Sequence, residues 1–146
     1  MSALKRIRDW LATFPGYDRL QSLRVDYLAA DPDNASIAPS GLIEVSRKEN
    51  IFGDTTVELQ YNFGLYYNFA KAAEDDEGST ENADWISDLQ QWVLDQSILG
   101  QAPVFGDEPK TEKIKAQNGT IYGATEEGTA IYMVQLSVNF TKKYTR

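Results

Sequence analysis

The chain has 146 residues, enough for a single domain spanning residues 1–146 with a sizeable core, and it contains neither cysteine nor histidine. The two missing residue types exclude disulfide bonds, thiolate metal sites, cysteine nucleophiles and any catalytic mechanism that uses histidine. The net charge of −8 disfavours reading of a nucleic acid sequence, because an acidic protein repels the phosphate backbone.

Residues 3–14 are predicted to form an amphipathic helix. Apolar residues recur at intervals of three and four, as on one face of a helix, while Lys5, Arg6 and Arg8 fill the other side. Pro15 ends the helix, because proline cannot continue the hydrogen-bond ladder. The basic cluster is either a solvated helix face or a docking face for an acidic partner. The apolar stripe consists of Leu4, Ile7, Trp10, Leu11 and Phe14.

A first strand and a turn are predicted next. Residues 22–30 alternate between apolar and polar side chains and indicate a strand, and residues 31–34 form a turn cluster. Asp31, Asp33 and Asn34 resemble a calcium loop only superficially, because the twelve-residue spacing and the closing glutamate are missing. We therefore expect no metal in this turn.

A hairpin is predicted to follow. Pro39 and Gly41 disfavour central pairing of the segment that contains them, so the strand is expected from Leu42 to about Asn50. A turn at residues 53–54 then leads into the next strand, and the two are predicted to pair antiparallel.

Residues 55–69 carry the longest regular pattern in the chain and organise the predicted fold. Every odd position from 57 to 69 is apolar or aromatic, whereas the even positions from 56 to 68 are polar residues or glycine except for Tyr66. This alternation is the period of a strand. We expect the apolar face, formed by the odd positions, to pack on helices. The alternative, a ligand-stacking aromatic platform, would need aromatic residues on the other face, where only Tyr66 stands.

An acidic segment and a second helix come next. Residues 71–84 hold many acidic residues and no apolar residue larger than alanine, which predicts a solvated loop. Residues 83–99 carry an apolar stripe with two tryptophans and predict an amphipathic helix that ends at Gly100 and covers the long strand. The stripe consists of Trp85, Ile86, Leu89, Trp92, Val93 and Leu99.

The rest of the chain completes an α+β fold. Residues 112–117 are predicted to form a short strand, residues 119–129 are loop-like, and residues 130–142 repeat the period-2 pattern of a long strand. This last strand is the natural partner of residues 56–69. The predicted fold is an antiparallel sheet of about four to five strands with two amphipathic helices packed on one face.

The sequence carries no catalytic signature. Phosphate loops, dinucleotide fingerprints, serine nucleophile elbows and zinc spacings are all absent from it. Neighbouring carboxylates such as Glu126 and Glu127 stand in polar surroundings that would not separate their pKa values, as acid–base catalysis requires. No apolar run reaches transmembrane length and no signal-peptide pattern opens the chain. We therefore expect a non-enzymatic protein without cofactors or metals that is made in a cytoplasm.

The order of these features resembles a family of small tail-assembly proteins from phages and prophages of Gram-positive bacteria. These are labelled minor capsid or tail completion proteins and are related to tail terminators. The resemblance covers nearly the whole chain except residues 71–82. In the first half of the chain, the resemblance rests on Phe14-Pro15-Gly16-Tyr17 leading into residues 23–28, on Ser36-Ile37 with Pro39, on Ile51-Phe52-Gly53 and on the strand with Tyr61, Phe63 and Leu65. In the second half, it rests on the helix from Trp85 to Trp92, on Gly100 with Pro103 and on the closing strand at residues 130–135.

The resemblance implies a structural protein of the virion tail. Tail terminators form a hexameric ring on the head-proximal end of the tail tube, stop its polymerisation and join it to the head. The implied partners are other copies of the chain, the tail tube protein and the head-side connector or stopper, with no membrane and no sequence-specific nucleic acid binding. Two other functions stay open: a small monomeric module that binds a ligand or protein near Tyr66, and a head completion or stopper protein.

One segment is a candidate functional surface within such a ring. Glu74, Asp75, Asp76 and Glu77 are the densest acidic run in the chain. If they lined the lumen, their carboxylates would keep passing DNA from adhering to the wall. The alternative is that this segment faces solvent outside the ring.

Overall fold

The computed structural model describes residues 3–20, 22–26, 28, 33–70, 76–107, 112–124 and 129–145. Its helices and strands follow one another in the order predicted, with a short 3₁₀ helix, η1, added after the first helix. They are α1 (Ala3–Leu11), η1 (Pro15–Arg19), β1 (Ser22–Val25), β2 (Asn34–Glu49), β3 (Thr55–Ala70), α2 (Asp76–Ile98), β4 (Lys113–Ala124) and β5 (Thr129–Tyr144).

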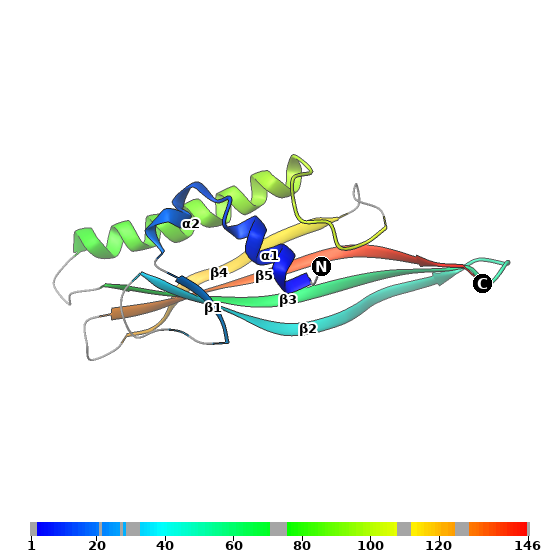
Figure 1. Cartoon of the computed structure of the whole chain (residues 1–146), viewed down its shortest axis with the longest axis horizontal. Helices are drawn as coiled ribbons and strands as arrows, with labels where there is room; N and C mark the ends of the chain where they lie inside the picture. The colour runs from blue at the N-terminus through cyan, green and yellow to red at the C-terminus, as the bar shows by residue number, and fades with distance from the viewer. Residues whose placement is uncertain are drawn as a thin grey trace.

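The strands form one five-stranded sheet in the order β1-β2-β3-β5-β4. The β2–β3 hairpin is antiparallel as predicted, and β3 pairs with β5 along its whole length, from Thr55 opposite Tyr144 to Ala70 opposite Thr129. Only β1 runs parallel to its neighbour. Figure 1 shows both helices above one face of this sheet, so the predicted α+β architecture is confirmed.

The core lies between the sheet and the helices. The period-2 patterns of the two long strands supply its floor. Phe63 and Leu65 of β3 lie opposite Leu136 and Val134 of β5, and Phe69 lies opposite Ala130, all buried. Because side chains alternate along a strand, the register sends both apolar sets to the helix side. This is the face that the sequence pattern predicted.

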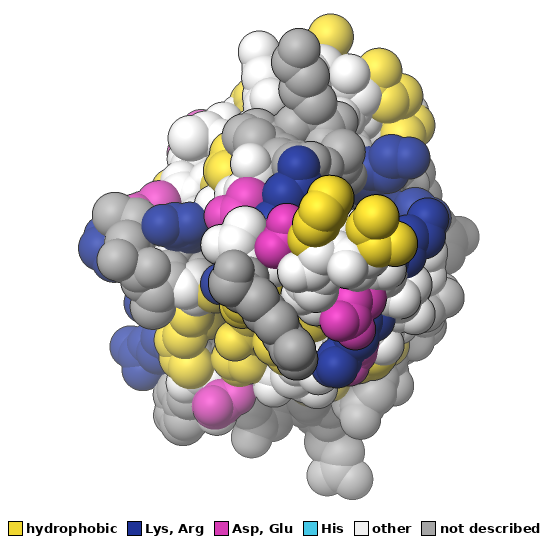
Figure 2. Space-filling model, turned by 90° about the vertical axis from the view of Figure 1, so that its right-hand side faces the viewer, with side chains coloured by type: hydrophobic (Ala, Val, Ile, Leu, Met, Phe, Trp, Pro, Cys, Tyr) yellow, Lys and Arg dark blue, Asp and Glu magenta, His cyan; other side chains and the backbone are white. Residues whose placement is uncertain are grey.

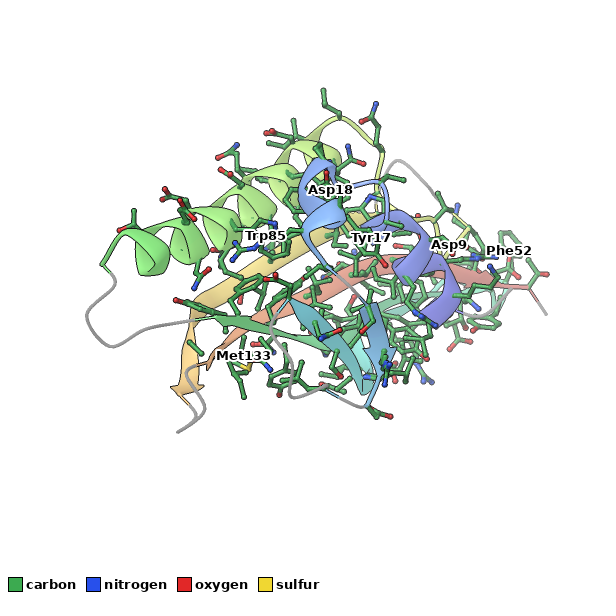
Figure 3. All side chains as sticks on the ribbon, turned by 60° about the vertical axis from the view of Figure 1, so that its left-hand side comes forward. Asp9, Tyr17, Asp18, Phe52, Trp85 and Met133 are labelled. Atoms are coloured by element: carbon green, nitrogen blue, oxygen red, sulfur yellow. The ribbon has the colours of Figure 1, made fainter. Side chains whose placement is uncertain are left out.

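Aromatic rings join the helices to this floor. Trp85 of α2 makes edge contacts with Phe14, Tyr67 and Phe69 at centroid distances of 4.7–5.4 Å. Its indole N–H donates to the carbonyl oxygen of Gly16 at 3.0 Å, which satisfies the one polar atom of the ring. Figure 3 shows Trp85 pointing from α2 toward the sheet, while Met133 lies on the opposite side of the sheet.

The second tryptophan of α2 packs differently from the prediction. Trp92 is only partly buried and stacks on Trp10 of α1, with ring centroids 4.6 Å apart, instead of covering β3. The sequence pattern placed both rings on one helix face, but the ring contacts of Trp92 are with Trp10 and Phe14. Leu99, the last member of the predicted stripe, lies beyond the end of α2 and is exposed.

The predicted loop at residues 71–84 is wrong over residues 76–84, because α2 begins at Asp76. The apolar stripe starts only at Trp85, so the earlier helical turns carry no pattern that would reveal them. Acidic residues suit the positive end of a helix, which favours a helical start at Asp76 and Glu77. The buried side chain of Asn82 also links this part of α2 to η1, because its Oδ1 accepts a hydrogen bond from the guanidinium of Arg19 at 2.5 Å.

The start of β2 corrects another prediction. Residues 34–37 pair with both β1 and β3, so the segment before Leu42 is central and not excluded from pairing. Pro39 is tolerated because β1 ends its pairing at Ile37, and from there β2 is an edge strand. A register shift between Pro39 and Gly41, with Gly41 at φ +102°, absorbs the irregularity.

Two strand lengths also differ from the predictions. β1 stops at Val25 instead of residue 30, because Asp26 adopts φ +54°, which ends an extended strand. β4 continues to Ala124 through a segment predicted as loop. The sixteen residues of β5 offer a full-length pairing partner, and two register shifts in β4 accommodate its irregular stretch.

Candidate assembly surface

Two buried ionisable groups, Tyr67 and Glu112, have raised pKa values. Burial, with a smaller contribution from the nearby Tyr17, raises the pKa of Tyr67 in the core. Burial also raises the pKa of Glu112, whose Oε1 accepts hydrogen bonds from the backbone N–H groups of Phe105 and Gly106 at 2.5 Å each. Within the described residues, no three acidic side chains gather as a metal site would require. The distinctive surface of the described part is apolar instead.

The sheet extends beyond the helices as an arm, which we define as residues 40–60 and 139–144. Figure 1 shows β2, β3 and β5 continuing past α1 to a narrow tip at one end of the molecule. The change is visible along β2, which is buried from Asn34 to Ile37 and exposed from Ser40 onward. Apolar residues nevertheless continue along this exposed part: Leu42, Ile43 and Val45 are each about half exposed.

The tip of the arm, residues 50–54, presents two large apolar side chains to solvent. Ile51 is 94% exposed and Phe52 is 79% exposed. The turn beneath them is closed by hydrogen bonds: the Asn50 N–H donates to the Asp54 carbonyl at 2.9 Å, and Asn50 Oδ1 accepts from the N–H groups of Phe52 and Asp54. Figure 2 views the molecule from this end and shows hydrophobic side chains gathered on it.

Exposure of this pair costs free energy that a contact would recover. Full burial of a side chain of this size contributes roughly 1.5–3 kcal/mol relative to leaving it in water. A tight turn normally carries polar residues and glycine, so two adjacent apolar residues at its apex are unusual. The tip is therefore a candidate contact site rather than a simple connection.

A groove on the helix side of the arm offers a second surface, lined by both apolar and polar side chains. One hollow of about 330 Å³ lies between α1 and the arm, and a neighbouring hollow of about 380 Å³ continues toward the tip. The two are continuous because they share Leu42, Leu59 and Tyr144. We call this continuous surface the arm groove. Its other lining residues include Arg6, Tyr61, Phe105, Phe140 and Lys142 in the first hollow and Glu44, Arg47 and Val57 in the second.

The backbone edges of the arm are protected. The outer edge of β2 is interrupted by Pro39 and by two register shifts, and it carries the charges of Arg47 and Lys48, which are devices that discourage strand addition. The opposite edge, where β5 continues past the start of β4, is covered by a loop: the N–H of Asp107 donates to the carbonyl of Thr141 at 2.8 Å. The arm therefore offers side chains rather than free strand edges.

The acidic run predicted as a functional surface falls mostly outside the described part of the chain. Glu74 and Asp75 lie outside the described residues. Asp76 and Glu77 begin α2, and this end of the helix lies at the end of the molecule opposite to the tip. The described part of the acidic run and the tip therefore lie far apart on the molecule.

The basic cluster of α1 has structural bonds to the rest of the molecule. Arg6 donates to the carbonyl of Val104 at 2.6 Å, and Arg8 donates to the carbonyl of Leu23 at 2.9 Å. Lys5 pairs with Asp9 one helical turn away. Two of the three basic side chains thus tie α1 to neighbouring segments, which weakens the interpretation of this face as a docking site for an acidic partner.

Tyr66, the residue proposed for ligand stacking, lies against its own sheet. A Cβ added to Gly64 would lie 3.1 Å from the Tyr66 ring, so the ring covers this glycine. Its neighbours on this face are polar: Ser137 donates to Asn62 Oδ1 at 2.8 Å, and Gln60 donates to Asn139 Oδ1 at 3.0 Å. An aromatic platform is not present among the described residues of this face.

Sequence reasoning missed the tip and the groove. The tip had a local signal, because Ile51 and Phe52 are adjacent apolar residues directly before the predicted turn at residues 53–54. The groove had none, since its walls come from α1, three strands and the segment around Phe105, which are distant in sequence. Its residues were assigned to the core face by their alternation, and nothing in that pattern shows where the helix layer stops.

No family model matches this chain, and no curated protein matches it either. None of the helices in the described part of the chain is both long enough and apolar enough to cross a membrane.

Proposed function

We propose that the protein is a non-enzymatic structural subunit that acts by assembling with copies of itself. The observation that carries this proposal is the arm, which holds Ile51 and Phe52 in solvent at its tip and a partly apolar groove along its helix side. Contiguous exposed apolar surfaces of this kind mark sites of protein–protein contact. Two different surfaces on one chain suit repeated assembly.

Within this class, we propose a tail terminator or tail completion subunit of a phage tail. The support is the order of sequence features that resembles this family, together with an α+β fold, which is the fold class that the resemblance implies. In this role the protein forms a ring. Its partners besides other copies of itself are the tail tube protein on one side and the head-side connector or stopper on the other. Its place is the virion tail, after synthesis in the bacterial host.

The test has two stages. Size-exclusion chromatography with light scattering measures the mass of the purified protein, alone and with tail tubes, and we expect assemblies larger than one subunit. Electron microscopy of tails should then place the subunit at the head-proximal end of the tube. A monomer at every concentration that forms no ring on tubes would favour a small binding module. A location on the head side of the joint would favour a head completion or stopper protein.

A further inference from the structure

We infer that residues 104–107 form a strap that opens and closes as one unit over the edge of β5, with Glu112 as its latch. The pairing of β4 with β5 begins at Lys113, opposite Asn139, and the strap lies against β5 beyond this point. The strap therefore controls access to the edge of β5 within the arm. This inference goes beyond the proposed function and does not depend on it.

The strap takes the place of a paired strand at Asp107. The N–H of Asp107 donates to the carbonyl of Thr141 at 2.8 Å, and its carboxylate accepts from the N–H of Lys143, also at 2.8 Å. These are edge groups of β5 that a neighbouring strand would otherwise bind, so one aspartate side chain replaces a strand carbonyl. Opening of the strap uncovers a donor and an acceptor for strand pairing.

Glu112 holds the strap from the side of β4. Its Oε1 accepts hydrogen bonds from the backbone N–H groups of Phe105 and Gly106 at 2.5 Å each. Glu112 directly precedes β4, which begins at Lys113, so this connection is anchored at the sheet. One side chain thus binds two consecutive residues of the strap, which is the arrangement expected of a latch.

The closed position of the latch carries a cost. Glu112 is 7% exposed, and its Oε2 is buried without a hydrogen-bond partner. A buried polar atom without a partner costs free energy, which is recovered when water reaches the atom. Burial also raises the pKa of this carboxyl, in keeping with that cost. Opening of the strap would let Oε2 hydrate, so the closed and open positions are balanced against each other.

The strap itself buries little apolar surface that would keep it closed. Val104 and Asp107 are exposed, and Phe105 is only partly buried. Segments held by a few solvent-accessible hydrogen bonds open locally while the rest of a fold stays intact. The strap is a segment of this kind, whereas the core beneath the helices is not.

Amide hydrogen exchange, followed residue by residue, tests whether the strap moves as one unit. Glu112→Ala removes the acceptor of Phe105 and Gly106, so these two amides exchange faster whatever the strap does. The amides of Asp107 and Lys143 have other acceptors and therefore report on the strap. We expect both to exchange about tenfold faster in Glu112→Ala than in the wild type.

The matched control is Glu112→Gln, which keeps an accepting oxygen for the two strap N–H groups. We expect exchange at Asp107 and Lys143 to stay within about threefold of the wild type in this variant. The reciprocal variant, Asp107→Ala, removes the acceptor of Lys143. If the strap is one unit, the amides of Phe105 and Gly106 exchange faster in it too, although their own acceptor is intact.

Each outcome decides the inference. Faster exchange at both ends of the strap in both alanine variants supports it, provided that glutamine restores protection and the core amides of Leu65 and Val134 are unchanged. Faster exchange only at amides whose own acceptor was removed would show separate hydrogen bonds and no unit. Equal acceleration of the core amides would show unfolding of the whole domain. Either result overturns the inference, as does a glutamine variant that exchanges like the alanine variant.

Discussion

Trp85 and Trp92 lie on the same helix but contribute differently to stability. Trp85 is 8% exposed, contacts three core rings and donates a hydrogen bond to Gly16, whereas Trp92 is partly buried and stacks on Trp10. We expect Trp85→Ala to lower the free energy of unfolding by roughly 3–5 kcal/mol. Trp92→Ala should cost less, because less of its surface leaves water. Urea denaturation of both variants measures the difference, and a larger loss for Trp92→Ala would contradict this packing.

The buried carboxyl of Glu112 leads us to expect that the stability of the fold depends on pH. Burial raises the pKa of its carboxyl, although the N–H groups of Phe105 and Gly106 and the charge of Arg6 oppose the shift. The folded state therefore holds this proton more tightly than the unfolded state, so the contribution of Glu112 to stability is full below the ordinary glutamate pKa and is lost as the pH rises through the folded pKa. The sign is opposite to that of a salt-bridged carboxylate.

The measurement compares Glu112→Gln with the wild type. Glutamine keeps an oxygen that accepts the two backbone N–H groups but never carries a charge. We expect the stability difference between variant and wild type to shift in favour of the variant as the pH rises from 4 to 7. Thermal unfolding across this range follows the change. A difference that is constant with pH would show that Glu112 does not titrate differently in the folded state.

At the scale of elements, the long strands were the most predictable part of the fold. In β3 and β5 every second side chain faces the core, so the period-2 pattern reports burial directly, and the register between them follows. The first turns of α2 were not predictable, because no apolar period marks them before Trp85. Sequence patterns thus reveal elements in proportion to the core they cover.

The arm groove shows a limit of a different kind. Leu59 and Tyr61 follow the same alternation as the buried Leu65 and Tyr67, yet they are only partly buried. The difference arises because α1 is short and the helix layer ends before the arm does (Figure 1). Alternation shows which face a side chain occupies, whereas the extent of the covering layer depends on contacts between distant segments.

The loop that covers the edge of β5 approaches that strand closely at Gly106. Gly106 lies against the strand so closely that a Cβ there would overlap the carbonyl oxygen of Thr141, which is backbone and cannot rotate away. We expect Gly106→Ala to lower the free energy of unfolding by about 1–3 kcal/mol, the usual cost of overpacking. Urea denaturation tests this. A variant as stable as the wild type would show that this loop does not rest on β5.

At the scale of the whole molecule, the arm and the acidic start of α2 lie at opposite ends (Figure 1). A ring subunit has two sides that contact its neighbours and others that face the lumen, the tail tube and the head. If the arm contributes to subunit contacts, the acidic run remains free to face something else. With a net charge of −8 on each copy, a ring concentrates negative charge, and the position of the densest run matters for passing DNA.

The lumen prediction concerns Glu74, Asp75, Asp76 and Glu77. If these acids line the ring, replacing all four with lysine turns a repelling wall into an attracting one. We expect particles that assemble but eject DNA slowly at low salt, with the defect easing as salt rises and screens the attraction. Ejection kinetics measured across a salt series test this.

The control must carry the same change in charge at another place. Lysine in place of Glu81, Asp84, Asp88 and Asp95 changes the charge of α2 equally, outside the acidic run. Lysine at residues 76 and 77 also opposes the helix dipole, so circular dichroism should first confirm that α2 is retained. A defect specific to residues 74–77 would place this segment in the lumen. Normal ejection at low salt, with the variant ring confirmed in the particle, would place it outside, because phosphates that pass four new positive charges in every copy must be slowed by them.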